Sequence, residues 1–162
     1  MARNVCYESV TTGGDPMRLT EQTRYALRVM AYCAQFHPKI VRVSEIAQAT
    51  GLTEYTIFKL LKVATKAGLI ISTRGRSGGI HLGISPDVLT VGFVVRVFEP
   101  RFQKCGPADM FDDVSENDDI LDQNANAAIG RGFNAFIREL DMIHISDMLK
   151  GVEQDQLQSA AV

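Results

Sequence analysis

The chain has 162 residues, of which 46% are hydrophobic and 22% charged, and its 3 cysteines are too few and too widely spaced for a disulfide framework. This composition excludes collagen-like and low-complexity chains and indicates an ordinary globular protein. No apolar run reaches the roughly 18 residues that a membrane-spanning helix needs, and residues 1–16 have no hydrophobic centre that could act as a secretion signal. We therefore expect a soluble, cytoplasmic protein that does not bind a membrane.

The formal net charge of −2 hides an uneven distribution of charge along the chain. Residues 17–98 hold eleven Lys and Arg against four Asp and Glu, a net charge of +7, whereas residues 99–162 hold five against thirteen, a net charge of −8. This division is expected of a protein whose first part binds a polyanion and whose second part does not.

The first predicted helix follows a leader. Residues 1–16 have no hydrophobic periodicity and include two glycines before Pro16, so we expect them to be flexible. Thr20 can cap a helix that carries Leu27 and Met30 at helical spacing, and Pro38 should stop it.

Two short helices separated by a glycine are predicted between Val43 and Leu61. Ser44 and Thr53 are the expected caps, and Gly51 can take the positive φ that a three-residue turn needs. This spacing is typical of a helix-turn-helix unit that binds DNA. A helical hairpin without a DNA role would give the same spacing, so both interpretations stay open on this pattern alone.

A β-hairpin is predicted next, because strand-like runs at residues 69–73 and 80–82 flank the segment Arg74-Gly-Arg-Ser-Gly-Gly. Its glycines let the backbone approach a surface closely, and Arg74 and Arg76 offer planar donors for phosphate or a guanine edge. The alternative is an exposed hairpin with solvated arginines. The helix pair, the hairpin and the regional charge together favour a winged helix that binds DNA. A nucleotide-binding loop is disfavoured, because the sequence has no GxxxxGK[ST] motif.

The second half of the chain contains a long predicted helix. Thr90 should cap a short helix over residues 91–98, and residues 99–119 are irregular and acidic. The helix from Ile120 to Asp141 would be about 33 Å long, more than a small winged domain can cover. Its apolar stripe therefore needs a partner. Packing on the chain's own domain is one alternative, and we favour a two-fold dimer. The predicted dimer contact comprises Leu121, Ala125, Ala128, Ile129, Gly132, Phe133, Phe136, Ile137 and Leu140.

Several motifs resemble those of the bacterial Rrf-two family of winged-helix regulators, the IscR, NsrR and RirA type. They are Met17-Arg-Leu-Thr, Tyr25-Ala-Leu-Arg, the helix pair from Val43, Lys66-Ala-Gly-Leu and the hairpin segment from Arg74, and the resemblance covers about residues 17–150. It implies a homodimeric transcription factor, typically a repressor, whose long helix forms the dimer contact. Many members also hold an iron-sulfur cluster through three cysteines between the winged domain and that helix.

This sequence departs from the family pattern at those cysteines. Cys105 is the only one in that stretch, and Arg24 stands where some nitric-oxide sensors supply an aspartate ligand. An iron-sulfur centre needs about four soft ligands, so one thiolate per chain does not suffice. A cluster shared by two protomers, a single-thiol switch at Cys105 and an inert cysteine remain open. We expect Cys33 to lie in the core and Cys6 to be incidental.

The predicted fold class is mainly α. The predicted parts are a flexible leader (1–16), a winged helix-turn-helix domain (17–98), a sensor-type loop (99–119), a dimerisation helix with a short terminal helix (120–150) and a disordered tail (151–162). The expected function is a homodimeric repressor that reads a palindromic operator with helix 53–67 and wing 74–79, and the alternative is a winged-helix protein-interaction module that has lost DNA binding. The sequence shows no catalytic constellation or small-molecule substrate site, so an enzyme is not expected, and no metal or cofactor is assigned. The residues predicted to contact double-stranded DNA are Arg18, Thr20, Ser44, Thr53, Glu54, Tyr55, Thr56, Lys59, Lys62, Arg74, Arg76, Ser77, Gly78 and Gly79.

Overall fold

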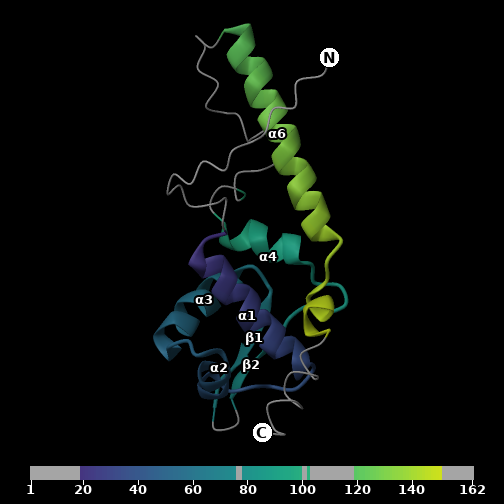
Figure 1. Cartoon of the computed structure of the whole chain (residues 1–162). Coiled ribbons are helices and arrows are strands. Elements are labelled where there is room, and N and C mark those ends of the chain that lie inside the picture. Colours follow the sequence, from purple (N-terminus) through teal and green to yellow (C-terminus); the bar gives the residue numbers. More distant parts are fainter. Residues whose placement is uncertain (1–18, 76–77, 100–101, 103–118, 151–162) are drawn as a thin grey trace, which may run out of the picture.

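The computed structural model describes residues 19–75, 78–99, 102 and 119–150. In chain order the elements are α1 (Glu21–Gln35), α2 (Val43–Thr50), α3 (Glu54–Lys66), β1 (Ile70–Thr73), β2 (Gly79–Leu82), α4 (Val91–Phe98), α6 (Ile120–Asp141) and the 3-10 helix η2 (Ile145–Leu149). The first four helices and the hairpin form one body, and α6 extends away from it past α4 (Figure 1). The predicted mainly helical fold with a β-hairpin is confirmed. The predicted leader and tail lie outside the described residues.

Threonine hydroxyls set the start of three helices. Thr20, Thr53 and Thr90 precede α1, α3 and α4, and each hydroxyl accepts a hydrogen bond from the backbone N–H three residues later, at 3.3, 3.2 and 3.1 Å. A side-chain oxygen at this position satisfies a donor that the helix itself leaves unpaired. These three predicted caps are confirmed.

The predicted cap at Ser44 is wrong. The helix α2 already begins at Val43, and Arg42 occupies the cap position. The Glu45 carboxylate accepts a hydrogen bond of 3.2 Å from the Arg42 backbone N–H. Because a glutamate three residues after the cap can satisfy this N–H, the helix starts without a hydroxyl at its cap.

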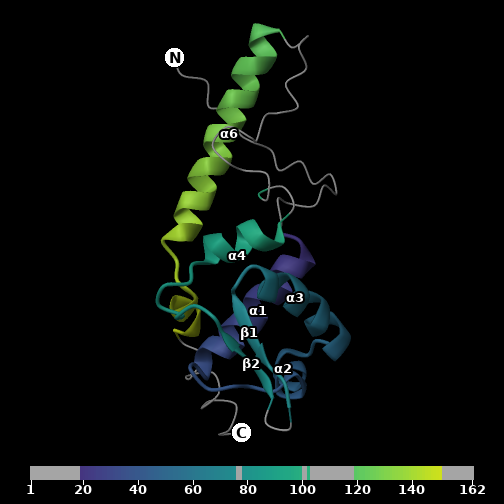
Figure 2. The same ribbon diagram turned by 180° about the vertical axis from the view of Figure 1, so that it is seen from behind.

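The core lies where α1 crosses the other elements of the body. Figures 1 and 2, which view the molecule from opposite sides, show α1 between the α2–α3 pair and the C-terminal segment. Met30, Ile46, Ile57, Leu69 and Val94 come from five different segments and are fully buried together. This shared core fixes α3 relative to the rest of the body.

The hairpin is tied to the connection between α1 and α2. Its strands are antiparallel, with Ile70 opposite Leu82 and Thr73 opposite Gly79. Val41 and Ile80 exchange two backbone hydrogen bonds, at 2.9 and 2.8 Å. A Cβ added at Gly79 would collide with the Val41 carbonyl oxygen. Gly79 is therefore required by this close backbone approach.

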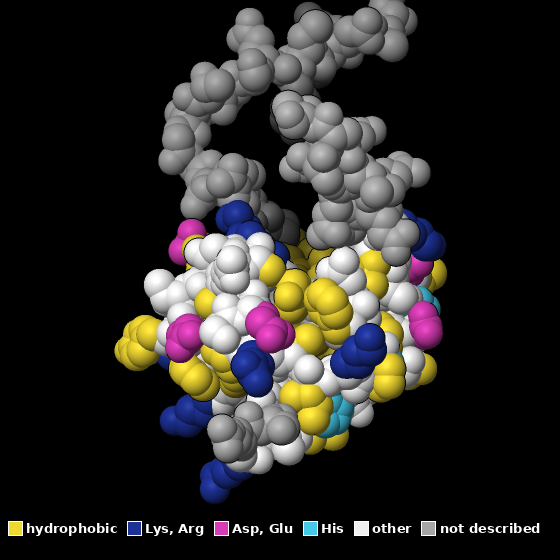
Figure 3. All heavy atoms as spheres, turned by 90° about the horizontal axis from the view of Figure 1, so that it is seen from below, with side chains coloured by type: hydrophobic (Ala, Val, Ile, Leu, Met, Phe, Trp, Pro, Cys, Tyr) yellow, Lys and Arg dark blue, Asp and Glu magenta, His cyan; other side chains and the backbone are white. Residues whose placement is uncertain are grey.

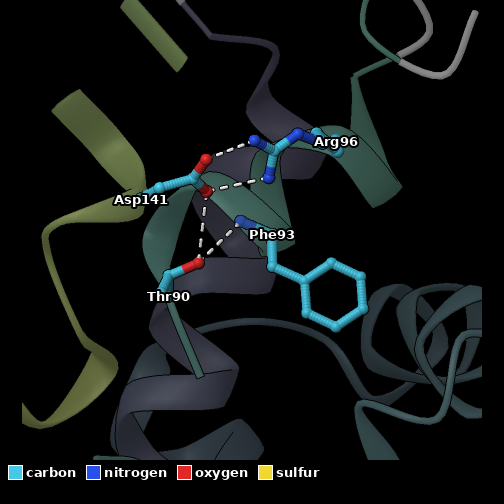
Figure 4. A network of polar contacts seen from close by, with 4 residues as sticks. All are labelled: Thr90, Phe93, Arg96 and Asp141. Carbon is cyan, nitrogen blue, oxygen red and sulfur yellow. Dashed lines mark hydrogen bonds and ion pairs between the residues drawn. The ribbon is translucent and has the colours of Figure 1, made fainter. Parts of the chain in front are cut away.

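Polar contacts fasten the C-terminal end of α6 to α4, as Figure 4 shows. The Arg96 Nη1 donates to Asp141 Oδ1 at 2.8 Å, and its Nη2 donates to the other carboxylate oxygen of Asp141. The Thr90 hydroxyl, at 3.4 Å from Oδ1, donates to the same carboxylate. A Cβ at Gly92 would overlap Asp141. We call Thr90, Arg96 and Asp141 the clasp. Hydrogen bonding to Arg96 lowers the pKa of Asp141.

The chain continues from the clasp back onto the body. The Val91 N–H donates to the Ile143 carbonyl and the Ile145 N–H to the Leu89 carbonyl, both at 2.8 Å. Ile145 is fully buried. The base of α6 is thus held by side-chain and backbone contacts together.

One predicted dimer residue belongs to the chain's own core. Ile137 is only 7% exposed and packs in the core, with Phe133 and Leu140 partly buried against it. The apolar period of α6 does not distinguish its base, which packs on the body, from the part beyond. There Leu121 and Ile129 are exposed. None of the described helices combines the length and the apolar character needed to cross a membrane.

Candidate nucleic-acid interface

The helix α3 has two distinct faces. Its buried face carries Ile57, Leu60, Leu61 and Ala64, which pack in the core. Its outward face carries exposed side chains three and four residues apart, which are neighbours on a helix surface. They are Tyr55, Phe58, Lys59, Lys62, Thr65 and Lys66. A helix held by one face thus presents a continuous cationic and aromatic face to solvent.

The turn between α2 and α3 is fixed from both sides. Gly51 has a φ of +68°, in the left-handed region that favours glycine. The Arg28 guanidinium, on α1, donates a hydrogen bond of 2.6 Å to the Thr50 carbonyl. The Thr50 hydroxyl donates to the Ile46 carbonyl at 2.6 Å. These contacts set the angle at which α3 leaves the turn, as the helix-turn-helix prediction requires.

The start of α3 brings four predicted DNA contacts together. Thr53 and Thr56 share a hydrogen bond of 2.8 Å between their hydroxyls. Glu54 and Tyr55 are exposed in the first turn. The Lys59 Nζ lies 4.5 Å from the centre of the Tyr55 ring, the geometry of a cation–π contact.

A groove of about 510 Å³ separates α3 from the hairpin. Its lining combines apolar, hydroxyl and ammonium groups: Val43, Phe58, Leu61, Lys62, Thr65, Lys66, Ser72, Thr73, Gly79 and Ile80. Figure 3 looks onto the end of the molecule that carries the hairpin tip and shows Lys and Arg side chains among hydrophobic ones. The sequence prediction missed Phe58 and Lys66, although the spacing that begins at Tyr55 and Lys59 places them on the same face.

The hairpin tip is only partly described. Arg74 is exposed beside Gly75, whose φ is +114°. A Cβ at Gly78 would lie 2.8 Å from the Gly75 carbonyl oxygen. The glycines at 78 and 79, predicted as DNA contacts, are thus also needed by the fold of the hairpin itself. Arg76 and Ser77 lie outside the described residues.

Two further predicted contacts, Thr20 and Ser44, lie on other elements than α3 and the hairpin tip. Thr20 lies at the start of α1, where its backbone N–H donates to the buried Glu99 carboxylate at 2.5 Å. Figure 1 shows this end of α1 beside α4, at the opposite end of the body from the hairpin tip. Ser44 is exposed in the first turn of α2. Arg18 lies outside the described residues.

Comparison with known proteins agrees with this geometry. A model of the Rrf2 family, described as iron-dependent transcriptional regulators, matches residues 19–151. The chain is 38% identical over 139 residues to protein aau3 of Rhizobium meliloti, which covers 85% of this chain and 88% of the relative. Among solved structures, IscR of T. potens is similar, with a TM-score of 0.65, 28% identity and coverage of 86% of this chain and 91% of that one. CymR, the global cysteine regulator of B. subtilis, has a TM-score of 0.64, 26% identity and coverage of 83% and 98%.

The residues that the structure describes do not fit an iron-binding group. In these ranges no group of three or more His, Cys, Asp or Glu could hold a metal ion. Cys33 is 1% exposed, as expected of a core residue, and burial raises the pKa of its thiol to about 12. Such a thiol is protonated near neutral pH and is a poor nucleophile. Cys6 and Cys105 lie outside the described residues.

Proposed function

Because the chain belongs to the Rrf2 family of transcriptional regulators, which are not enzymes, we propose that it is a homodimeric repressor that binds a palindromic operator. The observation that carries this proposal is the outward face of α3, where Lys62 and Lys66 line the groove beside the hairpin and Glu54 and Tyr55 are exposed in the first turn. A helix held by its opposite face in this way can enter the major groove of DNA.

Each part of the interface has a separate role in this proposal. The first turn of α3, with Thr53, Glu54, Tyr55 and Thr56, contacts base edges, because the first residues of a recognition helix reach deepest. Lys59 and Lys62 neutralise phosphates. The wing, residues 74–79, places Arg74 and Arg76 in the neighbouring minor groove, where a narrow A·T tract attracts guanidinium groups.

The dimer contact is proposed along α6 beyond its base. Leu121 and Ile129 are exposed there, and Gly132 has open space around it. Burial of this apolar surface against the same surface of a second copy would give a two-fold contact. Two-fold symmetry places the two α3 helices on half-sites about 34 Å apart.

The signal is proposed to act at Cys105 as a thiol switch. Cys33 is shielded by the core, so an oxidant should reach it poorly. A Cys105→Ser variant should therefore keep its DNA affinity when it is treated with hydrogen peroxide, whereas the parent protein should change its affinity. Equal responses of the two proteins would remove Cys105 from the mechanism.

The central test is a titration of the full chain against its promoter DNA at several salt concentrations. Binding through phosphates releases counterions, so the logarithm of the affinity should fall linearly with the logarithm of the salt concentration. An Arg74→Ala/Arg76→Ala variant should bind more weakly and with a shallower slope. Arg24→Ala removes an exposed positive charge in the first part of α1, at the opposite end of the body from the hairpin tip, and serves as the control. Salt-independent binding, or full affinity in the wing variant, would refute the proposal.

A further inference from the structure

Two large aromatic side chains on the outward face of α3 are left exposed by the fold. Tyr55 is 69% exposed and Phe58 is 56% exposed. A tyrosine can satisfy its hydroxyl in water, but a phenyl ring exposed to this extent gains little from folding. Phe58 therefore needs an explanation outside the core.

Contacts within the described part of the chain do not supply that explanation. The Lys59 ammonium group lies over the Tyr55 ring. The ring pairs found among the described residues join Tyr32 to Phe36 and Phe102 to Phe133 and Phe136. Phe58 instead lines the groove between α3 and the hairpin, next to Lys62. An exposed apolar ring thus lines the groove beside the Lys62 side chain, one helical turn further along α3.

We propose that Phe58 recognises thymine, by contact of its ring with the 5-methyl group in the major groove. This inference rests on the proposed function, because it assigns a base to the same DNA-binding face. Thymine is the one base whose major-groove edge carries a methyl group, and apolar side chains read it by contact. A phenyl ring has no donor or acceptor, so it cannot read the other bases by hydrogen bonds.

The positive charges near Phe58 favour nucleic acid, rather than an apolar protein surface, as the partner that contacts this face of α3. Lys59, Lys62 and Lys66 are exposed on the same outward face of α3 as Phe58, and Lys62 and Lys66 line the groove with it. The ammonium groups can pair with phosphates at the edge of the DNA groove, while the neighbouring ring contacts a base. A hydrophobic partner would have to desolvate these lysines without pairing them.

The test compares thymine with uracil, which differs from it only by the methyl group. Duplexes that bind the full-length protein are selected from a random-sequence pool and resynthesised with deoxyuridine in place of each thymidine in turn. Affinities are measured by fluorescence anisotropy at fixed salt. Loss of one buried methyl group should weaken binding about fourfold, and loss at both symmetry-related half-sites about 15-fold.

Two variants separate the contribution of Phe58 from that of the fold. Phe58→Ala should bind the thymine and uracil duplexes equally, and its helix should persist because alanine is a strong helix former. Phe93→Ala removes another partly exposed ring, on α4, and should keep the preference of the parent protein for thymine. Thermal melting of both variants checks that they are folded.

The outcomes distinguish this inference from the proposed function. DNA binding with no uracil-sensitive position, selected sites without thymine, or an undiminished thymine preference in Phe58→Ala would each refute thymine recognition alone. Absence of DNA binding at every salt concentration would refute the proposed function and, with it, this inference.

Discussion

The clasp between α4 and α6 leads to a quantitative prediction for Asp141→Asn. This substitution keeps the size of the side chain but removes the negative charge that Arg96 pairs with. It also weakens the acceptor for the Thr90 hydroxyl. The substitution therefore tests the clasp without opening a cavity.

The size of the expected loss of stability follows from how exposed the Arg96–Asp141 ion pair is to solvent. The Arg96 and Asp141 side chains are 38% and 34% exposed, so solvent screens their attraction substantially. Exposed ion pairs stabilise a folded protein by up to about 1 kcal/mol, and the bidentate geometry places this pair near the upper end of that range. We expect Asp141→Asn to lower the free energy of unfolding by about 1 kcal/mol at pH 7.

The stabilisation that Asp141 provides should depend on pH in one direction. The pKa of Asp141 is lowered in the folded protein, chiefly by the hydrogen bond from Arg96. The stabilisation is therefore fully present above the pKa of an unfolded aspartate, about 3.9, and is lost as the pH falls through the lower folded value. The difference between Asp141→Asn and the parent protein should stay constant from pH 7 to pH 5 and shrink below pH 4.

Urea denaturation at fixed protein concentration measures this effect. A double-mutant cycle with Arg96→Gln isolates the coupling between the two side chains from their other contacts. Asp87→Asn, on the exposed loop before α4, removes an equal charge elsewhere and is the control. Zero coupling energy, or a difference that persists unchanged to pH 3, would show that the clasp does not stabilise the fold.

Two further predictions concern the core. With Cys6 and Cys105 replaced by serine, Cys33 should react with a thiol reagent at pH 7 only when urea unfolds the protein, because burial raises its pKa to about 12; rapid reaction in the native state would contradict its shielding. Ile137→Ala should lower the free energy of unfolding by about 2–4 kcal/mol, measured in urea, and a loss below about 1 kcal/mol would contradict its place in the core.

Local chemistry made much of the fold predictable. The bounds of α6 coincide with the predicted Ile120–Asp141, and the caps at Thr20, Thr53 and Thr90 lie where a hydroxyl precedes an amphipathic period. These signals depend on residues within one helical turn, so the sequence displays them directly.

Contacts between distant segments were not predictable in the same way. The two glycines at positions 78 and 79 suggested a DNA contact, whereas the second of them is also required by the approach of Val41. The period that placed Ile137 in a dimer contact is the same period that buries it on its own body. At the candidate site, the sequence identified Tyr55 and Lys59 on α3 but not Phe58, because an apolar residue in a helix is first assigned to the core.

Because the base of α6 is fixed to the body, the helix and the body should move together. The side chains of Thr90 and Arg96 and backbone hydrogen bonds at Ile143 and Ile145 hold the base of α6 on the body. A helix fastened in this way should transmit a rotation to the body instead of absorbing it by bending at its base. In the proposed dimer, a rearrangement at the far end of α6 would rotate each body as a unit and thereby alter the separation of the two α3 helices, with little change inside either body.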